Sequence, residues 1–399
     1  MRKIAILLIC LGVQFINAQE RVITTAVPFL LVAADARSAG LADQGVATSP
    51  DAYSQQYNPA KYAFSQDKQG FSMSYTPYLT DLVNDISLGQ VTYFNRFDER
   101  MAFAAGLRYF GLGEIELRRD FDDLNPQIVE PNELAFDVSY ALQLSEKFSM
   151  AVAGRYIRSN LRIADAGTDA SAASSFAVDV AGYYQSEEIA YSDFNGRWRA
   201  GFNFQNLGPK ITYDAAEAQE LTGNFMPANM RVGAGFDFVL DEFNTVLVAV
   251  EFTKLLVPTP QVGFGQEGFT GEDLDGDGDV DIDDYNTSKD DYKRIGWVSG
   301  LFSSFGDAPD GFSEELKEFT YSVGAEYLYQ DSFAFRLGYF NESEMKGARK
   351  FFALGAGFKY NVVRIDLSYL FSASKVKNPL ENTLRFSLSF AFGDRYEQY

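Results

Sequence analysis

The chain has 399 residues, a formal net charge of −21 and no histidine. So acidic a chain offers no basic face for phosphates, which excludes nucleic acid as a partner. Without histidine the Ser-His-acid and His-Asp mechanisms are excluded, and we predict that the protein is not an enzyme.

The N-terminus is typical of a secretory signal peptide. Arg2 and Lys3 form the charged start, Ile4–Val13 form a short apolar run, and Ala18 closes a cleavage site. The run is too short to cross a bilayer as a helix, and no later stretch has eighteen consecutive apolar residues. We therefore predict a signal peptide over residues 1–18 and exclude a helical membrane protein.

Residues 19–68 precede the first strand and carry no strand pattern. They are rich in Ala, Asp, Gln and Gly, and they contain Asn58, Pro59 and Ala60. Asn before Pro favours a turn, here placed just before the first strand. We predict a periplasmic or plug segment over 19–68; the alternative is an exported linker that leads into a barrel formed by the strands that follow.

From residue 69 onward the chain alternates with period two, the signature of a strand with unlike faces. In the last strand the large apolar residues share one face, and small residues and Arg385 share the other. That apolar face carries Leu384, Phe386, Leu388, Phe390 and Phe392. A soluble sandwich also alternates, but a membrane barrel places its apolar face in lipid and small or charged residues inside, which fits the repeated pattern better.

The sequence therefore predicts an all-β fold: a transmembrane antiparallel β-barrel of about fourteen strands over residues 69–399, with an N-terminal plug segment. The strands are predicted at 69–77, 86–96, 99–110, 133–144, 147–159, 176–187, 196–206, 229–240, 244–255, 318–330, 332–341, 350–360, 362–372 and 383–393. The segment near 86–95 fits the alternation least well.

The connections alternate between short and long. Short joins such as Ser145-Glu146 and Gln330-Asp331 alternate with long ones, of which 256–317 is the longest. This asymmetry is typical of outer-membrane β-barrels, which have short turns in the periplasm and long loops outside the cell. The even strand number then places both termini in the periplasm. The join at 188–195 is an exception, since it is longer than the short turn expected there.

The alternation predicts which charges face the lumen. They are Arg108, Arg155, Arg199, Arg231, Arg336, Arg364, Arg385, Asp137, Asp179, Asp237, Glu326 and Asp366. We expect these charges to pair with each other and with the plug, because charges facing lipid would be costly. The alternative is a path for a ligand with an acidic group.

One motif in the long loop 256–317 indicates metal chemistry. Its carboxylates follow the spacing of a calcium-binding loop, with Gly278 at the sharp turn and Val280 at the apolar position. The predicted calcium ligands are Asp273, Asp275, Asp277, Asp279, Asp281 and Asp284. We predict that Ca²⁺ is bound structurally in this extracellular loop; the alternative is a solvated acidic surface loop.

The segments Asp35–Ala42, Asp51–Tyr53 and Asn58–Ala60 resemble the plug region of the fatty-acid-channel superfamily. Within it, the whole chain resembles the PorV family of the Bacteroidetes type IX secretion system. That resemblance implies a cell outer-membrane protein that associates with the translocon barrel and receives secreted cargo bearing C-terminal signal domains. The superfamily also allows a passive channel for hydrophobic molecules such as fatty acids, and the calcium motif alone would fit an adhesin-like surface barrel.

Overall fold

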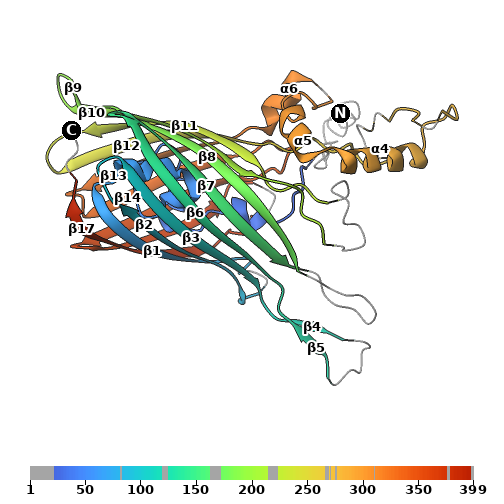
Figure 1. The fold of residues 1–399 in the computed structure, drawn as a ribbon, viewed down its shortest axis with the longest axis horizontal. Helices are drawn as coiled ribbons and strands as arrows, with labels where there is room; N and C mark the ends of the chain where they lie inside the picture. The colour runs from blue at the N-terminus through green and yellow to red at the C-terminus, as the bar shows by residue number, and fades with distance from the viewer. Residues whose placement is uncertain are drawn as a thin grey trace, which may run out of the picture.

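The computed structural model describes residues 22–80, 83–118, 125–161, 172–213, 223–265, 269, 271–274, 276–309, 311–374 and 378–396. In this part of the chain, fourteen long antiparallel strands form one sheet that closes into a barrel, because β17 pairs with β1 (Figure 1). The strands of the barrel are β1 Asp67–Pro77, β2 Ile86–Arg96, β3 Met101–Leu112, β6 Asn132–Ser145, β7 Phe148–Asn160, β8 Ala173–Gln185, β10 Asn195–Leu207, β11 Asn229–Val239, β12 Asn244–Leu255, β13 Thr320–Tyr329, β14 Phe333–Asn341, β15 Lys350–Tyr360, β16 Val363–Ser372 and β17 Leu384–Arg395.

The predicted barrel is confirmed, and the strand bounds are close to those expected. The largest difference is at β8, which was predicted from residue 176 and begins at Ala173. The weakly patterned strand β2 is present, and its inward face mixes polar residues with Leu88 and Phe94, which are buried against the N-terminal segment. The exceptional join at 188–195 contains the short strand β9, Ile189–Ala190, which pairs with the start of β10 and lengthens the turn.

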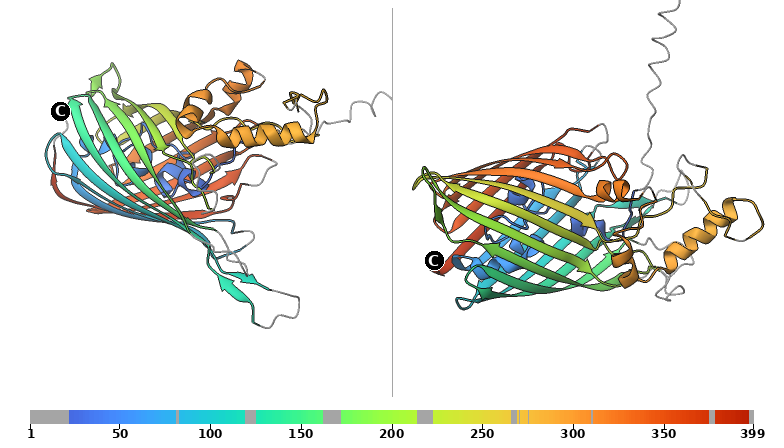
Figure 2. Two further views of the ribbon diagram at one scale, coloured as in Figure 1. Left: turned by 45° about the vertical axis from the view of Figure 1, so that its right-hand side comes forward. Right: turned by 90° about the horizontal axis from the view of Figure 1, so that it is seen from above.

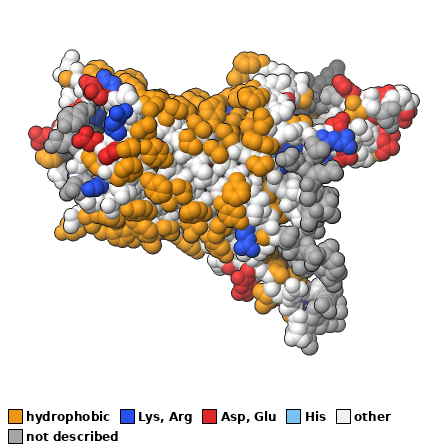
Figure 3. Space-filling model, in the orientation of Figure 1, with side chains coloured by type: hydrophobic (Ala, Val, Ile, Leu, Met, Phe, Trp, Pro, Cys, Tyr) orange, Lys and Arg blue, Asp and Glu red, His pale blue; other side chains and the backbone are white. Residues whose placement is uncertain are grey.

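The outer wall of the barrel is hydrophobic. On β14, Phe335 and Leu337 are 60% and 55% exposed, whereas Arg336 between them is 3% exposed and faces inward. Large apolar side chains from many strands form a band around the barrel in this way (Figure 3). Such a band fits the hydrocarbon core of a bilayer.

Within the described residues, no helix has the length and apolar character that a membrane crossing requires.

The two ends of the barrel differ. One, the short-turn end, carries connections such as Gln330–Ser332 and the C-terminal end of β17. The other, the long-loop end, carries the hairpin of β4 Ile115–Leu117 and β5 Gln127–Val129 and a helical loop between β12 and β13 (Figure 1). That helical loop contains α4 Ile282–Arg294, α5 Trp297–Ser303, α6 Phe312–Glu315 and η4 Leu316–Glu318.

The N-terminal segment lies inside the barrel (Figure 2). It contains η1 Pro28–Leu31, α2 Ala36–Gly40, α3 Ser54–Tyr57 and η2 Pro59–Phe64. The backbone N–H of Ala26 donates to the carbonyl of Phe225 in the β10–β11 connection, at the long-loop end. Asp67 pairs with Arg395 at the short-turn end. The segment therefore runs the length of the lumen.

The expectation that both termini lie in the periplasm concerns Met1 and Tyr399, which lie outside the described residues. Strand parity places Asp67 and Arg395 together, as expected. Parity says nothing of residues that precede the barrel, however, and the described chain begins at the opposite end because its N-terminal segment crosses the lumen.

Candidate functional site

The core of the lumen is an ion-pair network around α2. Asp35 caps α2 by accepting the N–H of Ser38 at 2.8 Å. Arg37 on α2 is buried and donates to both carboxylate oxygens of Glu326 on β13, at 3.1 and 2.8 Å, and it also pairs with Asp51. Arg336 on β14 joins the same carboxylate at 2.6 Å. Buried charges of this kind are tolerated only when paired, so the network joins the segment to the wall.

Small residues on the inner wall let this segment approach the strands closely. A Cβ added at Gly338 would lie 2.5 Å from the backbone N of Ala42, and one at Gly201 would lie 2.2 Å from the carbonyl oxygen of Val46. Glycine is needed at these positions because any side chain would collide with the backbone of the segment. The small inward faces seen in the sequence thus make room for residues 26–65.

The predicted lumen charges do lie on the inner wall, and most find partners there. The ion pairs are Arg155–Asp179 at 2.8 Å, Arg199–Asp237, Arg336–Asp366 at 2.8 Å, Arg364–Asp366 at 3.7 Å and Arg385–Asp43 at 3.3 Å. Asp137 accepts a hydrogen bond from Gln55 of the segment. Arg108 donates to the carbonyls of Phe29, Leu30 and Val32, which satisfies buried acceptors at the C-terminal end of η1.

Several ion-pair partners in the lumen were not predicted from the sequence, among them Glu251 and Arg37. Arg231 pairs with Glu251 at 2.9 Å, and Glu251 also accepts the backbone N–H groups of Gly45 and Val46. Glu251 could have been found, because it alternates with outward-facing residues of β12. Arg37 could not have been found in this way, because the five-residue helix α2 is too short to show a helical period in the sequence.

The predicted turn at Asn58, Pro59 and Ala60 is a cap with a second role. The side-chain oxygen Oδ1 of Asn58 accepts the N–H of Ala60 at 3.1 Å, and Pro59 begins η2. The Asn58 amide also donates to the carbonyls of Val46 and Gly182, each at 2.9 Å. The turn therefore binds the segment to itself and to β8 at once.

The helical loop is attached to the barrel by a second buried network. Lys254 at the end of β12 pairs with Glu318 and, at 3.2 Å, with Glu315. Lys346 in the β14–β15 connection pairs with Glu314 at 2.9 Å and Glu318 at 2.8 Å. All five side chains are buried. Two lysines from the barrel therefore hold α6 and η4 in place.

Neighbouring carboxylates in this network titrate in opposite directions. Burial acts to raise the pKa of Glu318, but hydrogen bonds from Lys254, Lys346 and Thr259 together lower it below its ordinary value. Burial raises the pKa of Asp307, and the nearby carboxylates of Glu318 and Glu315 raise it further. The network therefore favours the charged form of Glu318 and disfavours the charged form of Asp307.

The predicted calcium motif is folded as a tight loop before α4. Asp273 accepts the N–H groups of Gly276 at 2.7 Å and Gly278 at 3.1 Å, and both glycines have positive φ. The buried carboxylate of Asp284 accepts the N–H groups of Leu274 at 2.7 Å and Asp281 at 2.9 Å, which closes the loop.

Among the described residues, the carboxylates of the motif do not converge on one point. Asp281 caps α4 and Asp277 accepts the N–H of Asp279 at 2.9 Å, while Asp279 is exposed; Asp275 lies outside the described residues. Among described residues, the three carboxylates close enough to share an ion are Asp307, Glu315 and Glu318 instead. The backbone is curled as a calcium loop requires, and side-chain rotation would be needed to collect its oxygens.

Comparisons with known proteins give one family and a set of similar barrels. A family model described as Type IX secretion system protein PorV matches residues 15–262. No curated protein matches the chain. The Pseudomonas putida toluene transporter TodX is similar, with a TM-score of 0.46 and 12% identity over 88% of this chain and 95% of that chain. The Ralstonia pickettii toluene transporter TbuX has a TM-score of 0.48 and 13% identity over 92% of this chain and 100% of that chain. A Pseudomonas aeruginosa FadL homologue has a TM-score of 0.43 and 10% identity over 94% of this chain and 100% of that chain.

Proposed function

Because the chain belongs to the PorV family of type IX secretion system proteins, we propose that it is a non-enzymatic component of that system, which binds the outer-membrane translocon barrel and receives cargo bearing the C-terminal signal domain. The chain is an outer-membrane β-barrel. The lack of histidine supports a role without catalysis.

The observation that carries the proposal is the occupied lumen. The N-terminal segment crosses the barrel and is held by buried ion pairs from Arg37 and by the hydrogen bonds of Asn58. A passive channel for hydrophobic molecules needs an apolar path, whereas this lumen carries paired charges. The arrangement favours a function that uses the outer wall and the loops, as protein docking does.

The helical loop is the part of this surface best suited to docking. It is long, it carries the helices α4 to α6, and the networks of Lys254 and Lys346 hold it against the barrel. A surface that is ordered before binding loses less entropy on association. On this proposal the long-loop end faces the outside of the cell, the short-turn end faces the periplasm, and residues 1–18 are the signal peptide that directs export.

The proposal includes a calcium ion in the loop that precedes α4. The donor set fits a hard cation: closely spaced carboxylates, two glycines with positive φ, and the Asp284 carboxylate that closes the loop. An ion there would neutralise charges that otherwise repel one another, and so would order the start of α4 for docking.

Affinity purification of the tagged protein from its native outer membrane in mild detergent, followed by mass spectrometry, tests the role. We expect a large translocon barrel and proteins with type IX signal domains to co-purify. A variant with residues 269–296 replaced by a short Gly-Ser linker should recover less of them, and shortening the β4–β5 hairpin serves as the control. If the protein comes alone with bound fatty acid, the channel role replaces this one.

A further inference from the structure

A groove of about 710 Å³ lies on the outer wall of the barrel at its long-loop end. Phe252 of β12 and Tyr321 of β13, which are directly paired across the two strands, form part of its lining. Leu316 of η4 and Met345 of the β14–β15 connection line it as well. The groove therefore lies between the barrel wall and the loops that the two lysine networks hold in place.

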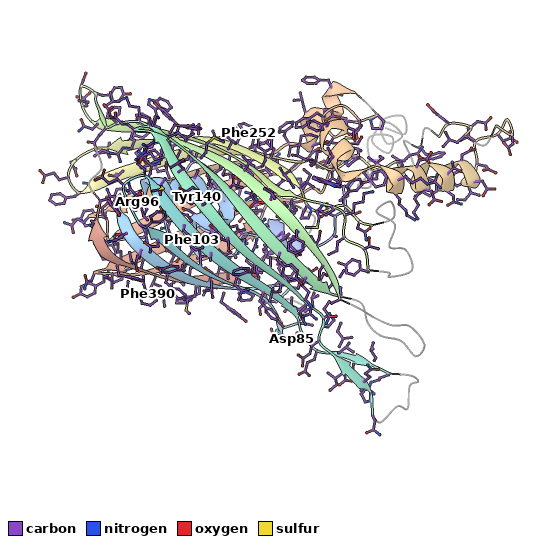
Figure 4. All side chains as sticks on the ribbon, in the orientation of Figure 1. Asp85, Arg96, Phe103, Tyr140, Phe252 and Phe390 are labelled. Atoms are coloured by element: carbon purple, nitrogen blue, oxygen red, sulfur yellow. The ribbon has the colours of Figure 1, made fainter. Side chains whose placement is uncertain are left out.

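This groove continues the hydrophobic band of the barrel. Phe252 is 46% exposed and Tyr321 37% exposed, and both belong to the lipid-facing side of their strands. Leu316 is 55% exposed although it lies on the helical loop. Figure 4 marks Phe252 on the outer edge of the barrel towards that loop, and Figure 3 shows hydrophobic side chains reaching this end of the band. Its apolar lining is thus placed where acyl chains end and headgroups begin.

Two lysines line the polar part of the groove. The exposed Lys317 contacts only the Met345 sulfur, at 3.1 Å, among the described residues, and sulfur is a weak acceptor. Lys350 pairs with Glu344 at 2.8 Å, but that carboxylate is 79% exposed, and such surface pairs are weak. Glu342 is held by Arg349 at 2.8 Å. Lys317 is therefore available to an anion, whereas Lys350 would have to exchange the exposed Glu344 carboxylate, which also lines the groove, for that anion.

We propose that this groove binds an outer-leaflet lipid that carries a phosphate headgroup, with an acyl chain on Phe252, Tyr321 and Leu316 and the phosphate between Lys317 and Lys350. Continuity with the lipid-facing band places the groove beside lipid already, and the lysines supply the charge that a phosphate needs. The bound lipid would fill the space under η4 and support the helical loop from the membrane side. The assignment to the outer leaflet rests on the orientation in the proposed function, whereas lipid binding in the groove does not depend on the secretion role.

Lipid retention by the full-length protein tests the headgroup preference. The purified barrel is titrated in non-ionic detergent with phosphatidylglycerol and, in parallel, with a glucosyl diacylglycerol that has the same acyl chains but no phosphate. Native mass spectrometry counts the retained lipids. We expect preferential retention of phosphatidylglycerol, and a loss of about fivefold for each of Lys317→Ala and Lys350→Ala. Lys147→Ala, which removes an exposed lysine paired with Glu187 at the short-turn end, is the matched control and should change nothing.

A fluorescent reporter tests whether acyl chains enter the groove. The chain has two tryptophans, Trp198 and Trp297, so Trp198→Phe with Trp297→Phe leaves none. Leu316→Trp then places a single reporter in the groove. In phosphatidylcholine–phosphatidylglycerol vesicles we expect strong quenching by lipids brominated in their acyl chains. Equal retention of the two lipids, unchanged retention in both lysine variants, or an unquenched reporter because protein covers the groove, would each overturn the proposal.

Discussion

The guanidinium of Arg37 lies 2.8 Å from the carboxylate of Glu326, so a helix near the start of the chain is bound to a strand 289 residues later. Arg336 shares the same carboxylate, and both arginines are buried. One acidic side chain on the inner wall therefore connects the N-terminal segment to the barrel.

Arg37→Met should loosen the N-terminal segment. The change removes the cation that pairs with Asp51 and leaves Glu326 paired with Arg336 alone. Breaking a buried ion pair costs about 3–5 kcal/mol. We expect a lower temperature for the heat-induced gel shift of the barrel and faster proteolysis of residues 26–65. Arg118→Met is the control, because Arg118 and Glu116 form a pair that is more than half exposed. Equal behaviour of the two variants would show that the network does not hold the segment.

Gly338→Ala should destabilise the same contact from the strand side. The new Cβ would collide with the backbone at Leu41 and Ala42, and overpacking of this kind costs about 1–3 kcal/mol. The unfolding midpoint in denaturant should fall. Gly154→Ala, on the outward face of β7, is the matched change, since a Cβ there meets nothing within 4 Å. A midpoint unchanged in Gly338→Ala would contradict the close packing described here.

Lys254→Gln should detach the helical loop while the barrel remains folded. Glu315 would lose its lysine and Glu318 would keep only Lys346, so local opening should become easier. Chymotrypsin should cleave within residues 256–319 about tenfold faster or more. Lys293→Gln on α4 removes an exposed lysine and should leave the rate as it was. No difference between the two variants would argue against the anchoring role of Lys254.

Acid should weaken the same anchor. The folded pKa of Glu318 lies below its ordinary value of 4.5, so its stabilisation is present above that value and is lost as pH falls through the folded pKa. Loop cleavage by an acid-active protease such as pepsin should therefore rise as pH is lowered below about 4.5, and Glu318→Gln should reduce this pH dependence.

The contribution of Asp307 to the stability of the loop should depend on pH in the opposite direction. Its folded pKa is raised above the ordinary 3.8, so its contribution is favourable below that value and is lost as pH rises through the folded pKa. Asp307→Asn keeps an acceptor for the Thr259 N–H and removes the charge beside Glu315 and Glu318. The loop should consequently be more resistant to chymotrypsin at pH 7 in this variant, and a less resistant loop would refute the reasoning.

Calcium should bind the loop before α4. Isothermal titration of the whole protein and of a peptide covering residues 265–292 should both give calcium heats. Asp273→Asn with Asp277→Asn should abolish them, because two of the predicted oxygen ligands lose their charge. Asp290→Asn on α4 lies outside the motif and is the control. If neither the protein nor the peptide gives a calcium heat, the motif is an acidic surface loop.

The alternation of side chains determined the barrel, because the face that a residue occupies depends only on local backbone geometry. Leu384 and Arg385 could therefore be assigned to opposite faces from the sequence, and the structure agrees, with exposures of 57% and 1%. The breaks in the same alternation indicated the short joins, and its inward phase indicated which charges face the lumen.

Only the tertiary structure decided the path of the N-terminal segment and the partners of the charges. Residues 26–65 have no period, so nothing local indicates that they cross the lumen or that Arg37 reaches Glu326. Such pairings depend on closure of the barrel between β1 and β17 and on the register of every strand between them. The anchor formed by Lys254 and Lys346 depends instead on the pairing of β12 to β15, because it joins the end of β12, the start of β13 and the β14–β15 connection.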